Sequence, residues 1–175
     1  SGRAPFPDLQ SYLAHLERIG ELRRVKVEVD PKFEIAEIVQ RVIRQNGPAL
    51  IFENVKGADF PVVLNMFGSE RRIEAALGRH PQEIGQELLH LVQKLNPPTL
   101  RTLWNARAQL LRARFMKPEV VSRAPAQEVV ESPQLDRLPN LWSWPRDGGP
   151  FITWGPTLTE DPRSGRRNFG LYRLQ

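Results

Sequence analysis

Two neighbouring stretches near the C-terminus decide the fold of this chain: Phe151-Ile152-Thr153-Trp154-Gly155-Pro156-Thr157-Leu158-Thr159 and Arg166-Arg167-Asn168-Phe169-Gly170-Leu171-Tyr172-Arg173-Leu174-Gln175. Aromatic and β-branched residues recur in both, and such residues favour strands. The residues between them, Glu160 to Gly165, contain a proline suited to a turn corner and a glycine suited to a positive φ. The sequence therefore predicts an antiparallel hairpin over residues 150–175.

The second strand of this hairpin carries residue types that can bind an anion or a metal phosphate. Arginine offers a forked donor, and asparagine offers a neutral carbonyl oxygen. In a regular strand Asn168 and Gly170 face one side, whereas Arg173 faces the other. A ligand shared by Asn168 and Arg173 is therefore expected to require a bulge or twist at Gly170, which would also let a flat ring approach the backbone. From residue types alone, an exposed strand with solvated charges is the alternative interpretation.

The composition limits the class of protein. With 175 residues and 40% hydrophobic content, the chain can bury one good core or two small ones. The absence of cysteine excludes disulfides and thiolate metal sites, and it fits an intracellular location. No apolar run approaches the roughly 18 residues that a membrane-spanning helix needs. The strand pattern continues to Gln175 without a terminating signal, so we expect a fragment of a longer chain.

Residues 1–95 are expected to form a small mixed α/β domain. Apolar residues at helical spacing predict helices that begin near Asp8, Pro31, Arg71 and Pro81. Short apolar or alternating runs predict strands over 22–29, 49–52 and 61–64. His15, His80 and His90 occur here without metal-ligand spacing, and no phosphate-binding loop or nucleophile elbow is present. The sequence therefore assigns no chemistry to this domain.

Residues 96–149 are expected to connect this domain to the hairpin. The net charge of +5 arises entirely in residues 100–175, which hold 12 Lys or Arg against 7 Asp or Glu. Residues 100–117 predict a basic amphipathic helix, whose apolar stripe is Leu100, Leu103, Trp104, Leu111 and Phe115. Two interpretations are open: a packed helix with its arginines paired to carboxylates, or a helix that contacts an anionic membrane surface. The prolines that recur up to residue 150 predict an extended segment.

Several sequence blocks resemble a known family. The C-terminal blocks are Trp144-Pro145-x-Asp147-x-x-Pro150-x-Ile152-Thr153-Trp154-Gly155 and Arg167-Asn168-x-Gly170-x-Tyr172-Arg173-x-Gln175. The N-terminal blocks are Gly20-Glu21-Leu22-Arg23-Arg24, Asp30-Pro31-x-x-Glu34-Ile35, the run from Gly47 to Gly57, and Asn65-x-Phe67-Gly68. In this order they resemble the UbiD-like decarboxylases, and among them most closely the polyprenyl-4-hydroxybenzoate carboxy-lyases of ubiquinone synthesis. Arg146 departs from the pattern, because close relatives carry an acidic residue there.

The resemblance implies an α+β or α/β fold with three parts. Residues 1–95 would be an N-terminal mixed α/β domain, and 96–149 the basic helix with a proline-rich connector. Residues 150–175 would be the first hairpin of a split β-barrel domain that binds flavin.

The resemblance also implies prenylated FMN and a divalent cation, Mn²⁺ or Mg²⁺, as cofactors. The family's metal-ligating asparagine corresponds to Asn168. The family's cofactor-lining run corresponds to Leu171, Tyr172 and Arg173, and the further cofactor-binding candidates are Asn168, Gly170 and, in the partner strand, Thr153. Arg173 also matches the arginine beside the substrate carboxylate, the catalytic position, where a bidentate donor is chemically suitable. The other metal ligands and the proton donor of the family lie beyond Gln175, so this chain alone is expected to be inactive.

The implied reaction is the non-oxidative decarboxylation of an aromatic or α,β-unsaturated acid, such as 4-hydroxy-3-polyprenylbenzoate in quinone biosynthesis. The partners expected are this small aromatic acid and further copies of the chain in a homo-oligomer. The location expected is the cytoplasm, with peripheral contact at the inner membrane face, and no nucleic acid is expected. The alternative function, based on the basic surplus, is a binding module for nucleic acid or an anionic membrane surface without catalysis. The chain lacks the motifs typical of nucleic-acid readers.

Overall fold

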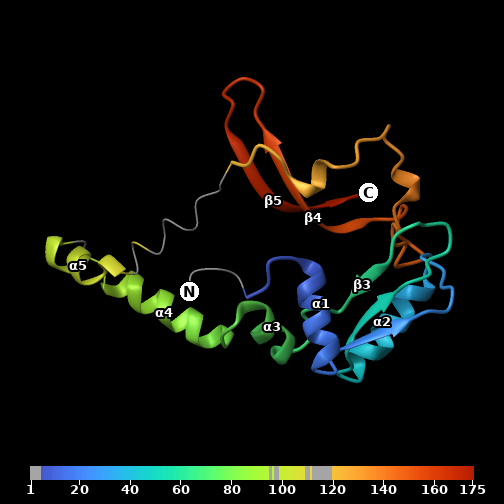
Figure 1. The fold of residues 1–175 in the computed structure, drawn as a ribbon, viewed down its shortest axis with the longest axis horizontal. Coiled ribbons are helices and arrows are strands. Elements are labelled where there is room, and N and C mark those ends of the chain that lie inside the picture. The colour runs from blue at the N-terminus through green and yellow to red at the C-terminus, as the bar shows by residue number, and fades with distance from the viewer. Residues whose placement is uncertain (1–4, 95, 97–98, 109–110, 112–119) are drawn as a thin grey trace. The chain divides into compact units, whose positions relative to one another are not determined.

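The structure is a computed structural model, and it describes residues 5–94, 96, 99–108, 111 and 120–175 (Figure 1). The chain forms two compact units, each of which joins segments distant in sequence. One unit combines Ser1–Arg18 with Ser69–Ser132, and the other combines Ile19–Gly68 with Pro133–Gln175. The boundaries expected from the sequence, 1–95, 96–149 and 150–175, stay a prediction.

The second unit contains a three-stranded sheet in the order β1-β2-β3. Its strands are β1 (Leu22–Val25), β2 (Ala49–Phe52) and β3 (Val62–Leu64). β1 pairs in parallel with β2, and the helix α2 (Glu34–Arg44) forms the crossover between them. β3 pairs antiparallel with β2. Side chains of α2 and β2 share one buried cluster: Val29, Ile35, Val39, Leu50, Phe52 and Val55. This cluster, named here the α/β core, is the main apolar core of the unit.

A segment distant in sequence is bonded to this core region. Leu141 packs against the α/β core. The backbone of Trp142 accepts a hydrogen bond from Phe33 N (2.8 Å) and donates one to Pro31 O (3.2 Å). The Lys32 ammonium lies 4.5 Å from the centre of the Trp142 ring. The connector that leads to the hairpin therefore has a fixed place beside α2.

The predicted hairpin is present as a sheet of its own, formed by β4 (Ile152–Glu160) and β5 (Arg167–Leu174) (Figure 1). Its turn closes with two backbone hydrogen bonds, from Gly165 N to Asp161 O (2.8 Å) and from Asp161 N to Arg166 O (2.9 Å). Gly165 has a φ of 66°, as expected for a turn glycine. The hairpin prediction is therefore confirmed.

The first unit is helical in the part that the structure describes. Its α-helices are α1 (Leu9–Arg18), α3 (Glu70–Leu77), α4 (Pro81–Lys94) and α5 (Leu100–Asn105). The Asp8 carboxylate caps α1 by accepting from Ser11 N (2.7 Å), as predicted. The Tyr12 hydroxyl donates to Arg72 O (3.0 Å) and so joins α1 to α3. Within the described residues, no helix is long and apolar enough to cross a bilayer.

Two predicted elements have different limits in the structure. The strand predicted over 22–29 ends at Val25, and Val27 is 69% exposed. The helix predicted from Pro31 begins at Glu34, because Phe33 adopts a φ of 70° and a ψ of −39°. Glu34 N donates to Lys32 O (2.9 Å) across Phe33, which makes a strained γ-turn before the helix.

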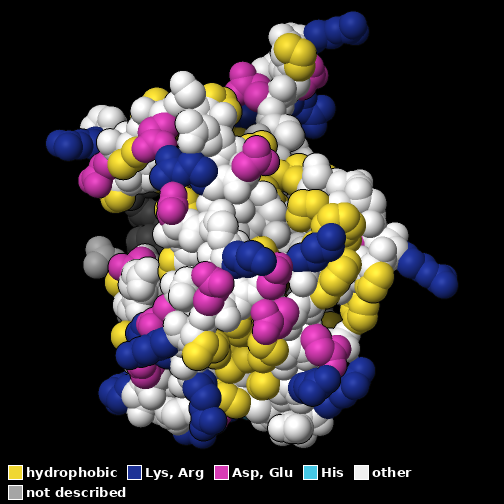
Figure 2. All heavy atoms as spheres, turned by 90° about the vertical axis from the view of Figure 1, so that its right-hand side faces the viewer, with side chains coloured by type: hydrophobic (Ala, Val, Ile, Leu, Met, Phe, Trp, Pro, Cys, Tyr) yellow, Lys and Arg dark blue, Asp and Glu magenta, His cyan; other side chains and the backbone are white. Residues whose placement is uncertain are grey.

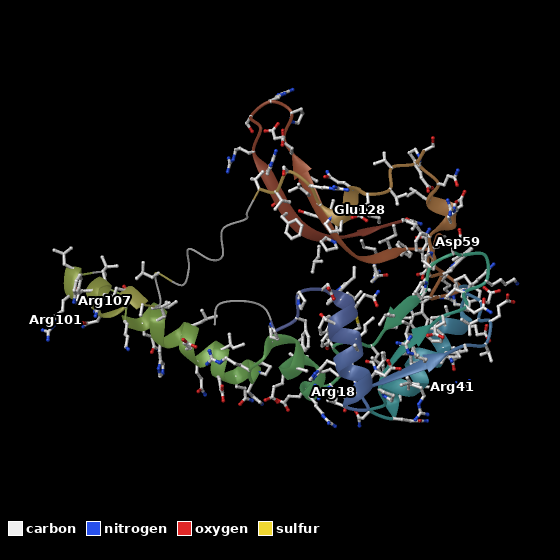
Figure 3. The ribbon with its side chains drawn as sticks, in the orientation of Figure 1. Arg18, Arg41, Asp59, Arg101, Arg107 and Glu128 are labelled. Atoms are coloured by element: carbon white, nitrogen blue, oxygen red, sulfur yellow. The ribbon has the colours of Figure 1, made fainter. Side chains whose placement is uncertain are left out.

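The connector region is less regular. The first part of the basic helix predicted over 100–117 is present as α5 (Leu100–Asn105). Residues 109–110 and 112–119, which include Phe115, lie outside the described residues. Two short 3₁₀ turns follow, Pro125–Gln127 in the first unit and Leu135–Arg137 in the second. Arg137 donates two hydrogen bonds to Asp59 (2.9 and 3.0 Å), which adds a polar link in the second unit; Figure 3 labels Asp59.

Candidate functional site

All but one of the predicted site residues lie on β5, and the pairing with β4 defines which of them share a face. Asn168 lies opposite Thr159, Gly170 opposite Thr157, and Tyr172 opposite Gly155. Since directly paired residues of an antiparallel ladder share a face, these six form one small and polar face. The structure therefore brings Asn168, Gly170 and Tyr172 together.

Asn168 and Tyr172 are bonded through their side chains. The Asn168 amide donates from Nδ2 to the Tyr172 hydroxyl (2.8 Å). Because Nδ2 donates to Tyr172, this hydrogen bond fixes the orientation of the Asn168 amide. The carbonyl oxygen Oδ1 keeps its lone pairs for another partner. An oriented carbonyl oxygen is a suitable single ligand for a hard divalent cation.

One carbonyl oxygen does not make a metal site. Such a cation requires six or more oxygen ligands. Within the described ranges, no group of three His, Cys, Asp or Glu side chains could hold a metal ion. The hairpin therefore fits a metal as the source of one ligand, and the others must come from residues outside this arrangement.

The space above Gly170 is occupied by Tyr172. A Cβ placed on Gly170 would lie 2.8 Å from Tyr172 Cε2 and 3.2 Å from Cζ. Glycine here makes room for the phenol ring, and this placement lets the hydroxyl reach Asn168. A flat cofactor at Gly170 would have to displace the Tyr172 ring, which is half exposed.

The opposite face of the hairpin is apolar. It pairs Leu158 with Phe169 and Pro156 with Leu171. Leu158, Phe169 and Leu171 are 62%, 71% and 63% exposed among the described residues. Leu171, predicted to line a cofactor, therefore lies on a different face from Asn168.

The ladder is interrupted beside Arg173 and not at Gly170. Pairing is regular from Arg167 to Tyr172, and the register shift lies in β4 between Ile152 and Gly155. The irregularity is in the partner strand, where Thr153 and Trp154 together oppose Arg173, and the bulge or twist that a ligand shared by Asn168 and Arg173 would require at Gly170 stays a prediction. A bulge re-aims neighbouring side chains, so Arg173 is the predicted site residue whose direction it affects.

Arg173 lies against an aromatic ring. Its guanidinium carbon is 5.3 Å from the centre of the Phe151 ring. The structure therefore does not join Arg173 to Asn168, and it adds Phe151, for which the sequence predicted no role. Its only sequence signal is its place at the start of the first β-rich stretch.

The charges at the tip of the hairpin are satisfied locally. Arg167 pairs with Glu160 (2.8 Å) across the strands. The Ser164 hydroxyl, which donates to Asp161 (2.6 Å), and the Arg163 N–H lower the pKa of the Asp161 carboxyl. Arg173 is thus better placed than Arg167 to bind an external anion.

Two cavities lie elsewhere in the described residues, and the hairpin site residues line neither. One of about 620 Å³ lies between α4 and α5, and the other, of about 210 Å³, is lined by connector and loop residues of the second unit. In the larger one Arg79 pairs with Glu87 (2.7 Å), which raises the pKa of Arg79. The cavity is lined by both basic and acidic side chains, whose charges partly cancel, and no function is assigned to it.

The basic character of the chain does not gather on the face shown in Figure 2, where Lys and Arg side chains alternate with Asp and Glu. After α5, Arg107 donates to Trp104 O (3.0 Å), and its guanidinium lies 4.8 Å from the Trp104 ring centre; Figure 3 labels this arginine. Among its described residues, the face in Figure 2 therefore shows no basic patch of the kind that a nucleic-acid binding module would use.

Two family models match the chain, one after the other. The first is described as the 3-octaprenyl-4-hydroxybenzoate carboxy-lyase N-terminal domain and matches residues 13–92. The second is described as the 3-octaprenyl-4-hydroxybenzoate carboxy-lyase Rift-related domain and matches residues 119–175. The second match includes the whole hairpin.

Solved structures of similar proteins agree with these matches. The UbiD-class enzyme HmfF from Pelotomaculum thermopropionicum, in an evolved dimeric form with prFMN, is 31% identical over 95% of this chain and 35% of its own, with a TM-score of 0.69. Vanillic acid decarboxylase from Sedimentibacter hydroxybenzoicus is 28% identical over 97% and 35%, with a TM-score of 0.72. A 3,4-dihydroxybenzoic acid decarboxylase from Enterobacter cloacae is 28% identical over 97% and 35%, with a TM-score of 0.70. The chain thus spans about a third of the length of these relatives.

Proposed function

Because this chain belongs to the UbiD family of carboxy-lyases, we propose that it forms part of an enzyme that removes CO₂ non-oxidatively from an aromatic or α,β-unsaturated carboxylic acid with prenylated FMN. The observation that carries the proposal is the hairpin, which lies in the second family match and presents an oriented asparagine and an outward arginine. The similar HmfF structure holds prFMN, which supports this choice of cofactor.

Each site residue has a role that follows from its chemistry. The planar Arg173 guanidinium can hold the substrate carboxylate with two parallel hydrogen bonds, which fixes the bond to be broken. Asn168 Oδ1 would give one ligand to a Mn²⁺ or Mg²⁺ ion, and the Tyr172 hydroxyl holds the amide for that purpose. When bound, prenylated FMN supplies the electron sink for decarboxylation.

The remaining lining residues have supporting roles in this proposal. Thr153 would contact the cofactor from β4, Gly170 leaves room for the Tyr172 ring that holds Asn168, and Leu171 would exclude water from its apolar side. Apolar side chains around a carboxylate lower the local dielectric and so strengthen the hydrogen bonds that Arg173 makes.

The proposed substrate is a hydroxylated benzoic acid, with 4-hydroxy-3-polyprenylbenzoate in ubiquinone synthesis as the specific example. Both family models are described as domains of 3-octaprenyl-4-hydroxybenzoate carboxy-lyase, which supports this example. Two similar enzymes are named for vanillic and 3,4-dihydroxybenzoic acid, which supports the wider class.

The location and the assembly of the enzyme are also part of the proposal. We place the enzyme in the cytoplasm as a homo-oligomer, with Leu100 and Trp104 at the inner membrane face. These side chains are 89% and 67% exposed among the described residues, and basic residues adjoin them. Vesicles with anionic lipid should bind the wild type more than a Trp104→Ala variant.

The test of the proposed function is turnover by the complete protein that carries this chain, loaded with either FMN or prenylated FMN. Benzoic acids with 3- and 4-hydroxyl groups, with and without a prenyl tail, are offered, and CO₂ release is measured. We expect CO₂ only with prenylated FMN, in amounts equal to the acid consumed. Release of no CO₂ from any acid by the loaded protein would refute the proposal.

A further inference from the structure

The contact between Phe151 and Arg173 has a geometry that suits orientation of the arginine. The guanidinium carbon is 5.3 Å from the ring centre, within the range of a cation–π contact. A guanidinium that stacks on a ring keeps its in-plane N–H groups available for hydrogen bonds. The ring can therefore restrict the plane of Arg173 without using its donors.

Phe151 itself is held by the connector and, through it, by the α/β core. Its backbone N–H donates to Leu141 O (2.9 Å), and the two residues form an antiparallel bridge. Leu141 packs against the α/β core, and the adjacent Trp142 is bonded to the turn that precedes α2. The ring thus has a support outside the hairpin, whereas Arg173 is an exposed residue near the end of β5.

The bulge in β4 adds to this arrangement. Thr153 and Trp154 oppose Arg173 in place of one residue, so Arg173 has no directly paired residue across the ladder. An exposed arginine side chain has many rotamers, and ordering it on a ligand costs conformational entropy. A neighbouring ring that selects one guanidinium plane would lower this cost.

We propose that Phe151 is a positioning residue for Arg173, which it holds with the N–H edge of the guanidinium directed at a carboxylate ligand. The inference rests on the proposed function only in assigning the carboxylate to Arg173. It predicts that Phe151 acts through Arg173 and contributes to carboxylate affinity in no other way.

The test uses the complete protein and benzoate as the probe, with affinity measured by calorimetry. Phe151→Leu and Phe151→Met remove the ring but keep apolar volume, and Phe151→Tyr keeps the ring. We expect the first two to weaken benzoate binding by about two- to fivefold and Phe151→Tyr to bind like the wild type. Phe60→Leu, a change at a half-exposed ring of the same unit, is the control and should have no effect.

Two further comparisons separate positioning from general packing. In an Arg173→Ala background, Phe151→Leu should cause no additional loss, because the two residues act as one unit. Benzamide, which has no charge, should bind the wild type and Phe151→Leu equally. Equal losses in both backgrounds, an equal loss for benzamide, or a Phe151→Tyr variant as weak as Phe151→Leu would overturn the inference. So would a wild type that does not bind benzoate.

A spectroscopic measurement tests the geometry without turnover. In the 175-residue chain, the Arg173 side-chain protons should show a ring-current shift that persists in Phe151→Tyr and disappears in Phe151→Leu. No such shift in the wild type would overturn the inference. A complete protein that binds benzoate as described but releases no CO₂ would refute the proposed function alone.

Discussion

Replacement of Gly170 by alanine should separate Asn168 from Tyr172 without unfolding the hairpin. The new Cβ would lie 2.8 Å from Tyr172 Cε2, a distance at which the ring must move. Tyr172 is 48% exposed, so its ring can turn outward into solvent. The hydrogen bond between the two side chains, 2.8 Å in the wild type, would then be lost.

The energy change of this substitution is small because two effects oppose each other. An exposed side-chain hydrogen bond contributes about 0.5–1.5 kcal/mol to stability. Alanine in a strand recovers about 0.5–1 kcal/mol of backbone entropy relative to glycine, and Gly170 does not adopt a positive φ. We therefore expect the free energy of unfolding to change by no more than about 1 kcal/mol.

The assay is the NMR signal of the Asn168 side-chain amide in the 175-residue chain. It should shift in Gly170→Ala to the position found in Tyr172→Phe, which removes the hydroxyl alone. Gly155→Ala is the matched control, because Gly155 lies opposite Tyr172 and its Cβ would meet nothing closer than 3.6 Å. An unmoved amide signal in Gly170→Ala, or an equal movement in Gly155→Ala, would refute this prediction.

Three other changes have defined outcomes. Phe52→Ala should lower the free energy of unfolding by about 3–5 kcal/mol in urea titrations, since Phe52 is fully buried in the α/β core, and a loss below about 1 kcal/mol would contradict the assignment. Gly148→Ala should displace the Gln175 side chain, whose Nε2 lies 2.5 Å from the added Cβ, and an unchanged Gln175 amide signal in NMR would refute this. The pKa of Asp161 is lowered, chiefly by the hydrogen bond from the Ser164 hydroxyl. The ionised Asp161 carboxylate therefore stabilises the turn above the pKa of the unfolded chain, and this stabilisation is lost as the pH falls through the pKa of the folded chain. Amide signals of the turn should therefore titrate at a lower pH in the wild type than an unstructured Asp carboxyl does, and they should stay constant in Asp161→Asn; identical titrations would disprove the role of this carboxylate.

The sequence predicted the elements that depend on local pattern. The hairpin followed from two β-rich stretches and a turn with Gly165, and the first helix followed from Asp8 and an apolar stripe. The start of α2 could not be predicted in this way. Phe33 adopts its strained backbone while its N–H donates to Trp142, which is more than a hundred residues away in sequence.

In the candidate site, too, local features could be predicted from the sequence and long-range contacts could not. Strand alternation correctly separated Asn168 from Arg173, because period-two geometry is local. The sequence offered Gly170 as the residue that would permit a bulge, and it gave no signal for the bulge that the pairing shows in β4. The contact of Phe151 with Arg173 depends on Leu141 and the α/β core, and these long-range contacts leave no mark on the sequence near either residue.

The most direct test of the central claim, that Arg173 holds the carboxylate beside a flavin bound at this hairpin, is Arg173→Lys in the complete protein loaded with prenylated FMN. Bound flavin is measured by absorbance and CO₂ release is measured separately, with Arg163→Lys in the exposed turn as the control. Lysine keeps the charge but loses the fork, so flavin content should match the wild type while CO₂ release falls by roughly 10- to 100-fold. Wild-type CO₂ release by Arg173→Lys at equal flavin content would contradict the account.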